Sequence, residues 1–202
     1  MLKLKELYDY CQTLSVPPRI KRNLVAEKIT QLTGLEARVF IVDLDTEVCR
    51  GLFLSACNED VPLVRMAGGK AVIAIARGMN RCWDRFVQVK ELMHLFDSED
   101  EMTGTPEAFK HLLTEFSVRL PDFDTSKQMN SEVRALVMAL ACLCPETQRL
   151  QFVEARKRGE IDNYQVAVQL RIPEFYVQTL LVPRFAEIVA SFWAPPVQVA
   201  VD

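Results

Sequence analysis

Residues 85–96, with the sequence RFVQVKELMHLF, constrain this chain more than any other stretch. An α-helix turns once in about 3.6 residues, so a helix over this segment places Lys90 and His94 one turn apart on one face. Glu91 lies beside them. The segment therefore predicts an ammonium, a carboxylate and an imidazole at one site on one helix.

This spacing is that of the zinc-peptidase motif HExxH, with Lys90 in place of the first histidine. In that motif two histidines bind Zn²⁺, a third ligand comes from elsewhere, and the glutamate takes a proton from the metal-bound water. Glu91 and His94 stand at the positions of the general base and the second histidine. A glutamate three residues before a histidine also occurs by chance on many helices, so the motif alone predicts little.

Two segments together resemble the ImmA/IrrE-type metallopeptidase family. RFVQVKELMH resembles the family's RFTLAHELGH, and the matching residues are Arg85, Phe86, Glu91, Leu92 and His94. Downstream, EVRALVMALACLCP resembles ExxANxFAAxLLMP, and the matching residues are Glu132, Ala135, Ala139, Leu143 and Pro145. The resemblance covers about residues 20–180 and is weak outside these two segments.

The resemblance implies a zincin-like fold and a metal site in which His94 and Glu132 are ligands and Glu91 is the general base. Arg85 and Phe86 belong to the same site segment. Several family members are zinc peptidases that act on helix-turn-helix repressors in phage, mobile-element or stress-response control. This chain departs from the family pattern at Lys90.

Three functions follow from these residues. The favoured one is a pseudo-metallopeptidase without a cofactor, in which the Lys90 ammonium neutralises Glu91 and Glu132. Its fold then serves as a regulatory, transcription-related module that senses a signal or binds a protein partner, such as a helix-turn-helix regulator. The second is an active zinc-dependent endopeptidase that cleaves such a repressor, although lysine, with a pKa of about 10.4, is a poor zinc ligand. The third is an unrelated helical binding protein in which the motif arose by chance.

The order of elements predicts an α+β fold that is mostly helical, with a small three-stranded sheet. The expected helices are residues 2–14, 19–33, 106–119 and 131–144, together with the motif helix after Asn80 and a break at Pro17-Pro18. The expected strands are residues 37–44, 48–57 and 70–76, with a hairpin turn at Gly68-Gly69 and a loop at residues 121–124. His111 fits an exposed helix face better than a metal site.

Residues 1–145 are predicted to form the metallopeptidase-type domain, residues 146–193 a C-terminal helical subdomain, and residues 194–202 an extended tail. Within the subdomain, residues 166–180 resemble a helix-turn-helix. Their second helix offers no arginine or lysine for phosphates, so direct nucleic-acid binding is not expected.

Composition agrees with a cytoplasmic protein. The formal charge is −3, and neither a bilayer-spanning apolar segment nor a signal peptide is expected. The six cysteines do not form CxxC pairs, and most are expected to be buried thiols.

Overall fold

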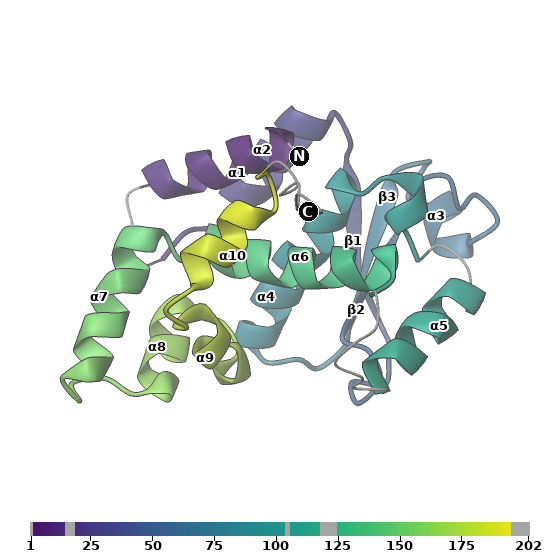
Figure 1. Ribbon diagram of the computed structural model, residues 1–202. Helices are drawn as coiled ribbons and strands as arrows, with labels where there is room; N and C mark the ends of the chain where they lie inside the picture. Colours follow the sequence, from purple (N-terminus) through teal and green to yellow (C-terminus); the bar gives the residue numbers. More distant parts are fainter. Residues whose placement is uncertain (1, 15–18, 104–105, 118–124, 195–202) are drawn as a thin grey trace, which may run out of the picture.

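The computed structural model describes residues 2–14, 19–103, 106–117 and 125–194 (Figure 1). Its helices in the first half of the chain are α1 (Leu2–Thr13), α2 (Arg22–Thr33), α3 (Pro62–Met66), α4 (Arg81–Leu92) and α5 (Pro106–Ser117). Those in the second half are α6 (Lys127–Leu143), α7 (Glu146–Lys157), α8 (Asn163–Leu170), α9 (Val177–Leu180) and α10 (Phe185–Ser191). Three short 3₁₀ helices are η1 (Met93–Phe96), η2 (Glu99–Glu101) and η3 (Glu174–Tyr176).

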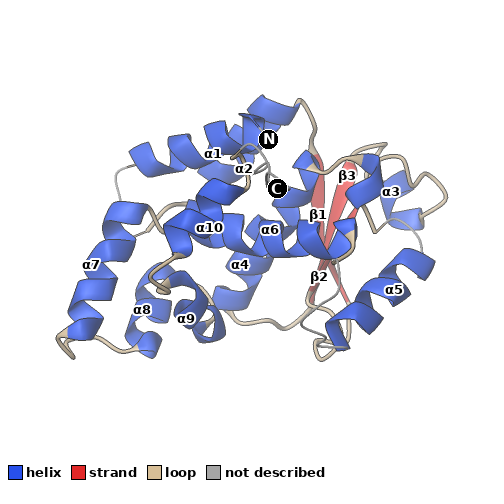
Figure 2. Cartoon of the chain, viewed as in Figure 1, coloured by secondary structure: helices blue, strands red, loops and turns tan. Residues whose placement is uncertain are grey.

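The sheet has three strands, β1 (Ala37–Val42), β2 (Gly51–Leu54) and β3 (Ala71–Ala76). Their order is β1-β3-β2, with β1 parallel and β2 antiparallel to β3. Figure 2 shows these strands at one side of a largely helical molecule. The predicted α+β class with a small three-stranded sheet is therefore confirmed.

The predicted hairpin turn at Gly68-Gly69 is wrong. β2 and β3 do pair, but α3 lies between them in the chain, and the two glycines follow that helix. Both have a positive φ, 70° and 77°, which suits glycine. The pair thus turns the chain from α3 into β3, a role that the strand pattern alone did not reveal.

The central strand β3 is buried along its whole length, because elements cover both faces of the sheet. On one face Ile73 and Ile75 belong to the main core, which also contains residues of α1, α2, α4 and α6. On the other face Val72 and Ala74 pack with Val64 of α3 in a smaller cluster. The main core therefore fixes α4 and α6 next to the sheet.

Local signals explain several helix ends. The Asn80 side chain accepts hydrogen bonds from the backbone N–H groups of Cys82 and Trp83 at the start of α4. Gly34 ends α2 in the left-handed conformation, as the sequence predicts. α6 begins four residues earlier than expected, at Lys127, with Ser126 as its N-cap. Glu132 consequently lies in the second turn of α6 and not near its first residue.

The C-terminal helices share the main core with the first part of the chain. Val166, Leu170 and Leu180 are fully buried in the same cluster as residues of α4 and α6. The second helix of the helix-turn-helix-like stretch consists only of η3 and the four residues of α9. The predicted boundary near residue 145 stays a prediction.

Other sequence-based expectations have mixed outcomes. Half of the cysteines, Cys11, Cys142 and Cys144, are buried, so the expectation that most are buried is wrong. In the described part of the chain, no helix has both the length and the apolarity needed to cross a membrane. The predicted break at Pro17-Pro18, the loop at residues 121–124 and nearly all of the predicted tail, residues 195–202, lie outside the described residues.

Candidate functional site

Four ionisable residues of the two motif segments, Lys90, Glu91, His94 and Glu132, meet between α4 and α6. The Lys90 Nζ atom lies 3.0 Å from Glu91 Oε1 and 2.5 Å from Glu132 Oε2. The His94 Nε2 atom lies 3.4 Å from Glu132 Oε1 and 3.8 Å from Glu91 Oε2. The structure thus brings together Glu91, His94 and Glu132 as predicted, and places an ammonium group between the two carboxylates.

Lys90 is held as a cation by its neighbours. Its side chain is only 18% exposed. Burial alone would lower the pKa of Lys90, but the negative charges and hydrogen bonds of Glu91 and Glu132 raise it above its usual range. Burial likewise opposes ionisation of Glu132, and the charges of Lys90 and His94 reverse that effect and lower the pKa of Glu132. The Lys90 ammonium and the Glu132 carboxylate therefore keep each other charged.

His94 lies in η1, the 3₁₀ turn that directly follows α4. Its Nδ1–H donates a hydrogen bond of 2.7 Å to Asp97 Oδ2, which leaves Nε2 facing the carboxylates. Nε2 is buried and makes no hydrogen bond. Burial disfavours a charged imidazole, yet the Asp97 bond and the charges of Glu91 and Glu132 raise the pKa of His94.

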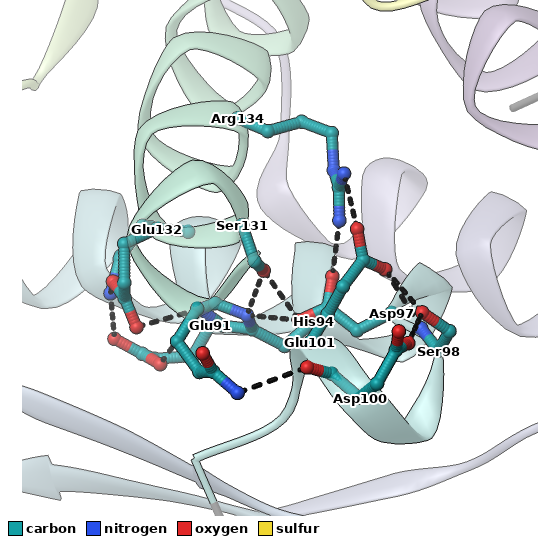
Figure 3. A network of polar contacts seen from close by, with 11 residues as sticks. Glu91, His94, Asp97, Ser98, Asp100, Glu101, Ser131, Glu132 and Arg134 are labelled. Atoms are coloured by element: carbon teal, nitrogen blue, oxygen red, sulfur yellow. Dashed lines mark hydrogen bonds and ion pairs between the residues drawn. The ribbon is translucent and has the colours of Figure 1, made fainter. Parts of the chain in front are cut away.

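A second polar network fixes Asp97 behind the imidazole (Figure 3). Ser131 Oγ donates to Asp97 Oδ2 at 2.6 Å, and Arg134 Nη2 donates to Asp97 Oδ1 at 2.9 Å. Arg134 also donates to Glu101 at 2.8 Å. Two residues of α6 therefore set the orientation of His94 through one carboxylate.

This network is not a serine-hydrolase triad. A triad needs the serine on one imidazole nitrogen and the carboxylate on the other. Here Ser131 Oγ lies 3.3 Å from His94 Nδ1, the same nitrogen that bonds Asp97. The hydroxyl proton is directed to Asp97, so His94 cannot remove it.

Cys49 lines the same cleft but is not set up as a nucleophile. Its thiol donates a hydrogen bond of 2.8 Å to the carbonyl oxygen of Gly51. Burial and the nearby charge of Glu91 raise the pKa of the thiol. A protonated thiol is a weak nucleophile.

The residues do not fit a zinc ion. A catalytic zinc site uses three protein ligands, each about 2 Å from the metal, and an open fourth position. The donors here are His94 and the two carboxylates, and the Lys90 ammonium stands within 3.0 Å of both carboxylates. A positive group at that place repels a second cation. Within the described ranges, no group of three or more histidine, cysteine or acidic side chains is arranged to hold a metal ion.

Gly51 lets β2 approach α4 closely beside Glu91. A Cβ atom at this position would lie 2.3 Å from Val87 Cγ1 and 3.0 Å from Glu91 Oε1. The first distance is too short for a methyl group, and the second is tighter than an ordinary van der Waals contact. Gly51 thus belongs to the site, although a single glycine in a strand pattern gives only a weak signal for a close approach.

Above the charged residues the cleft is a cavity of about 280 Å³. Part of its wall is aromatic: Phe86 packs on Tyr176 with ring centroids 4.6 Å apart, and Trp83 meets Tyr176 edge-on at 5.7 Å. The Arg50 guanidinium lies over the Trp83 ring at 4.2 Å. Tyr176 comes from η3, so the C-terminal part of the chain helps to build the site.

A second hollow, of about 680 Å³, lies beyond His94 and Asp97. It shares those two residues, Phe53 and Met102 with the first cavity. Although it is larger, it lacks Lys90, Glu91 and Glu132 in its lining. The chemistry therefore belongs to the smaller cavity.

The remaining predicted residues divide in two. Phe86 lines the cleft, whereas Arg85 points away from it and donates to the backbone carbonyls of Leu170 and Ile20. Arg85 is therefore a structural residue, and its prediction as part of the site is wrong. His111 is largely exposed and lies 3.8 Å from Glu115 on α5, as expected for a residue outside the site.

No family model, no curated protein and no solved structure matches this chain. The geometry of the cleft is consequently the basis on which its function is assigned.

Proposed function

We propose that this protein is a catalytically degenerate relative of the ImmA/IrrE-type metallopeptidases, with a zincin-like fold, that acts in the cytoplasm as a non-catalytic regulatory module. One observation carries the proposal: the Lys90 ammonium lies between the carboxylates of Glu91 and Glu132, at 3.0 and 2.5 Å. It supplies the positive charge that a metal supplies in an active site of this kind. One covalently attached cation takes the place of one bound ion.

The surroundings of Glu91 and His94 argue against peptide hydrolysis. The glutamate of a zinc peptidase takes a proton from a water that the metal has acidified. In this chain Glu91 Oε1 accepts a hydrogen bond from the Lys90 ammonium group, and the His94 imidazole has a raised pKa. Both groups belong to the charge cluster around Lys90.

The cleft supports a protein partner. Its wall is formed mainly by apolar and aromatic side chains, and its polar groups include Arg50, Lys90, His94 and the carboxylates. Such a pocket suits an apolar side chain presented by a polypeptide. A helix-turn-helix regulator is the partner class we favour, bound without being cut.

The alternative is an active zinc-dependent endopeptidase that cleaves such a repressor. One observation favours it: His94 is oriented by Asp97 through Nδ1, the arrangement that usually presents Nε2 to a metal. The Lys90 ammonium opposes it. Zinc binding separates the two functions.

The decisive experiment compares the natural protein with Lys90→His, which restores an imidazole pair one helical turn apart. We expect the natural protein to retain less than stoichiometric zinc after dialysis and to show no change in Tm on zinc addition. Lys90→His should bind zinc. At a free zinc concentration of about 100 times the Kd, binding stabilises this variant by about 2.7 kcal/mol. For a chain of this size the gain corresponds to roughly 5–10 °C in Tm.

Lys90→His/Glu132→Gln is the matched control, because it keeps the new imidazole but removes one ligand, and its zinc response should be much smaller. Stoichiometric zinc in the natural protein, with chelator-sensitive cleavage that Glu91→Ala abolishes, would establish the peptidase instead. Equal zinc responses of the natural protein and Lys90→His would show that Lys90 does not stand at a metal position.

A further inference from the structure

Among the described strands, β1 forms an edge of the sheet, on the side away from β2. The Glu36 carbonyl accepts a hydrogen bond from the Ala71 N–H, and the Val42 carbonyl accepts one from the Arg77 N–H. Backbone groups of alternate residues point to opposite sides of a strand, so residues with even numbers face β3. The N–H and C=O groups of Val39 and Ile41 therefore point outward, where no described strand pairs with them.

The side chains of these two residues are also uncovered. Val39 is 47% exposed and Ile41 is 58% exposed. They project from the same face of the sheet as Ile73 and Ile75 of β3. α4 covers this face over β3. Phe40 and Val42 project from the other face, toward α3.

Edge strands of monomeric proteins are usually protected by charged residues, prolines or bulges. β1, with the sequence ARVFIV, contains one charged residue and no proline, and its pairing to β3 is continuous from Ala37 to Val42. Arg38 is that charge, and it lies on the opposite face from Val39 and Ile41. The outer face of this edge is thus unprotected.

We propose that β1 pairs antiparallel with β1 of a second copy of this chain, with the two-fold axis at Phe40, to form a six-stranded sheet. In this register Val39 stands opposite Ile41 of the second copy, and Ile41 opposite its Val39. Both residues have outward backbone groups, so the two pairs exchange four hydrogen bonds. Phe40 faces its own counterpart on the other side of the sheet.

Self-complementarity selects a second copy over another partner. A two-fold axis requires each surface to match itself, and here it places the exposed branched side chains against each other twice. Moving the axis to Val39 would instead place Ile41 against Ala37. A single strand pair is smaller than a standard stable interface, so the dimer is reversible and depends on concentration.

The first test is sedimentation of the full chain from low to high micromolar concentration. The natural protein shifts from monomer to dimer, Ile41→Lys stays monomeric, and Val168→Lys, which replaces an exposed valine on α8, dimerises like the natural protein. Unchanged circular dichroism of Ile41→Lys shows that it remains folded. A natural protein that stays monomeric, or a dimer that survives Ile41→Lys, overturns the proposal.

The second test uses thiol cross-linking to determine which residues of the two β1 strands lie opposite each other. It is done in a Cys57→Ser background, which removes the exposed cysteine. A mixture of Val39→Cys and Ile41→Cys proteins should cross-link with a short bifunctional reagent, whereas each variant alone and the Cys57→Ser parent should not. Cross-linking of either variant alone overturns this register. No cross-link in the mixture overturns the pairing.

Discussion

At the scale of single residues, Lys90 determines the character of the cleft. Its ammonium balances two carboxylates whose side chains are 3% and 17% exposed. Removing one partner of a buried ion pair costs about 3–5 kcal/mol, because the other charge is left without compensation. Partial solvent access at Lys90 and Glu132 reduces that cost.

We expect Lys90→Ala to lower the free energy of unfolding by about 3 kcal/mol, measured by urea denaturation at neutral pH. Lys90→Met/Glu132→Gln should recover part of this loss, since it removes a positive and a negative charge together and keeps the side-chain volumes. A double variant as unstable as Lys90→Ala would mean that charge compensation is not the cause.

The pH dependence gives an independent check of the Lys90→Ala prediction. The folded pKa of Glu132 is lowered, so its contribution is present above the ordinary glutamate pKa of about 4.3 and is lost as pH falls through the folded value. The difference in stability between the natural protein and Lys90→Ala should therefore shrink in acid. A constant difference would contradict the ion-pair explanation.

At the scale of elements, the contact between β2 and α4 sets the distance between the strand and Glu91 in the cleft. At Gly51 the strand and the helix lie so close that an added Cβ atom would meet the side chains of Val87 and Glu91. A larger residue must push the strand and the helix apart. The position of Glu91 thus depends on a residue 40 positions earlier in the chain.

Gly51→Ala should destabilise the fold by about 1–3 kcal/mol, the usual cost of forcing extra volume into a packed contact. Gly51→Ala/Val87→Ala is the informative companion, because it removes the Cγ1 atom that the new methyl group meets. The double variant should be less unstable than the sum of the two single variants, as measured in a double-mutant cycle. Strict additivity would show that the two positions do not compete for space.

At the scale of the whole molecule, Arg85 joins three distant parts of the chain. From α4 its guanidinium donates to the carbonyl of Leu170, the last residue of α8, at 2.7 Å and to the carbonyl of Ile20, which precedes α2. Burial, and the nearby charges of Arg19 and Arg171, lower the pKa of Arg85 to about 10, so it is still charged at neutral pH. The N-terminal helices, the motif helix and the C-terminal helices therefore meet at one cation.

Replacing Arg85 by methionine should cost about 3 kcal/mol, because buried carbonyl groups lose their donors. Arg81→Met, which removes an exposed arginine from the same helix, should change the free energy of unfolding by less than about 0.5 kcal/mol. Thermal unfolding of both variants measures the difference. An Arg85→Met variant as stable as Arg81→Met would show that the C-terminal helices do not depend on this link.

The sequence by itself determined the helices, strands and helix ends that depend on residues close together in the chain. The Gly34 stop, the helix after Asn80 and the three branched segments of the sheet follow from local backbone preferences. Their spacing in the sequence also predicts that Lys90 and Glu91 lie close to His94. The first two residues lie on α4, and His94 lies in the turn that directly follows it.

Only the tertiary structure decided which distant segments meet. The helix between β2 and β3, the contact of Tyr176 with the cleft and the carbonyl partners of Arg85 join positions that carry no periodic signal toward one another. The Gly51 contact with Glu91 is of the same kind. Such contacts arise from the packing of whole elements around a shared core, and packing depends on the summed shape of many side chains and not on the residues at the contact alone.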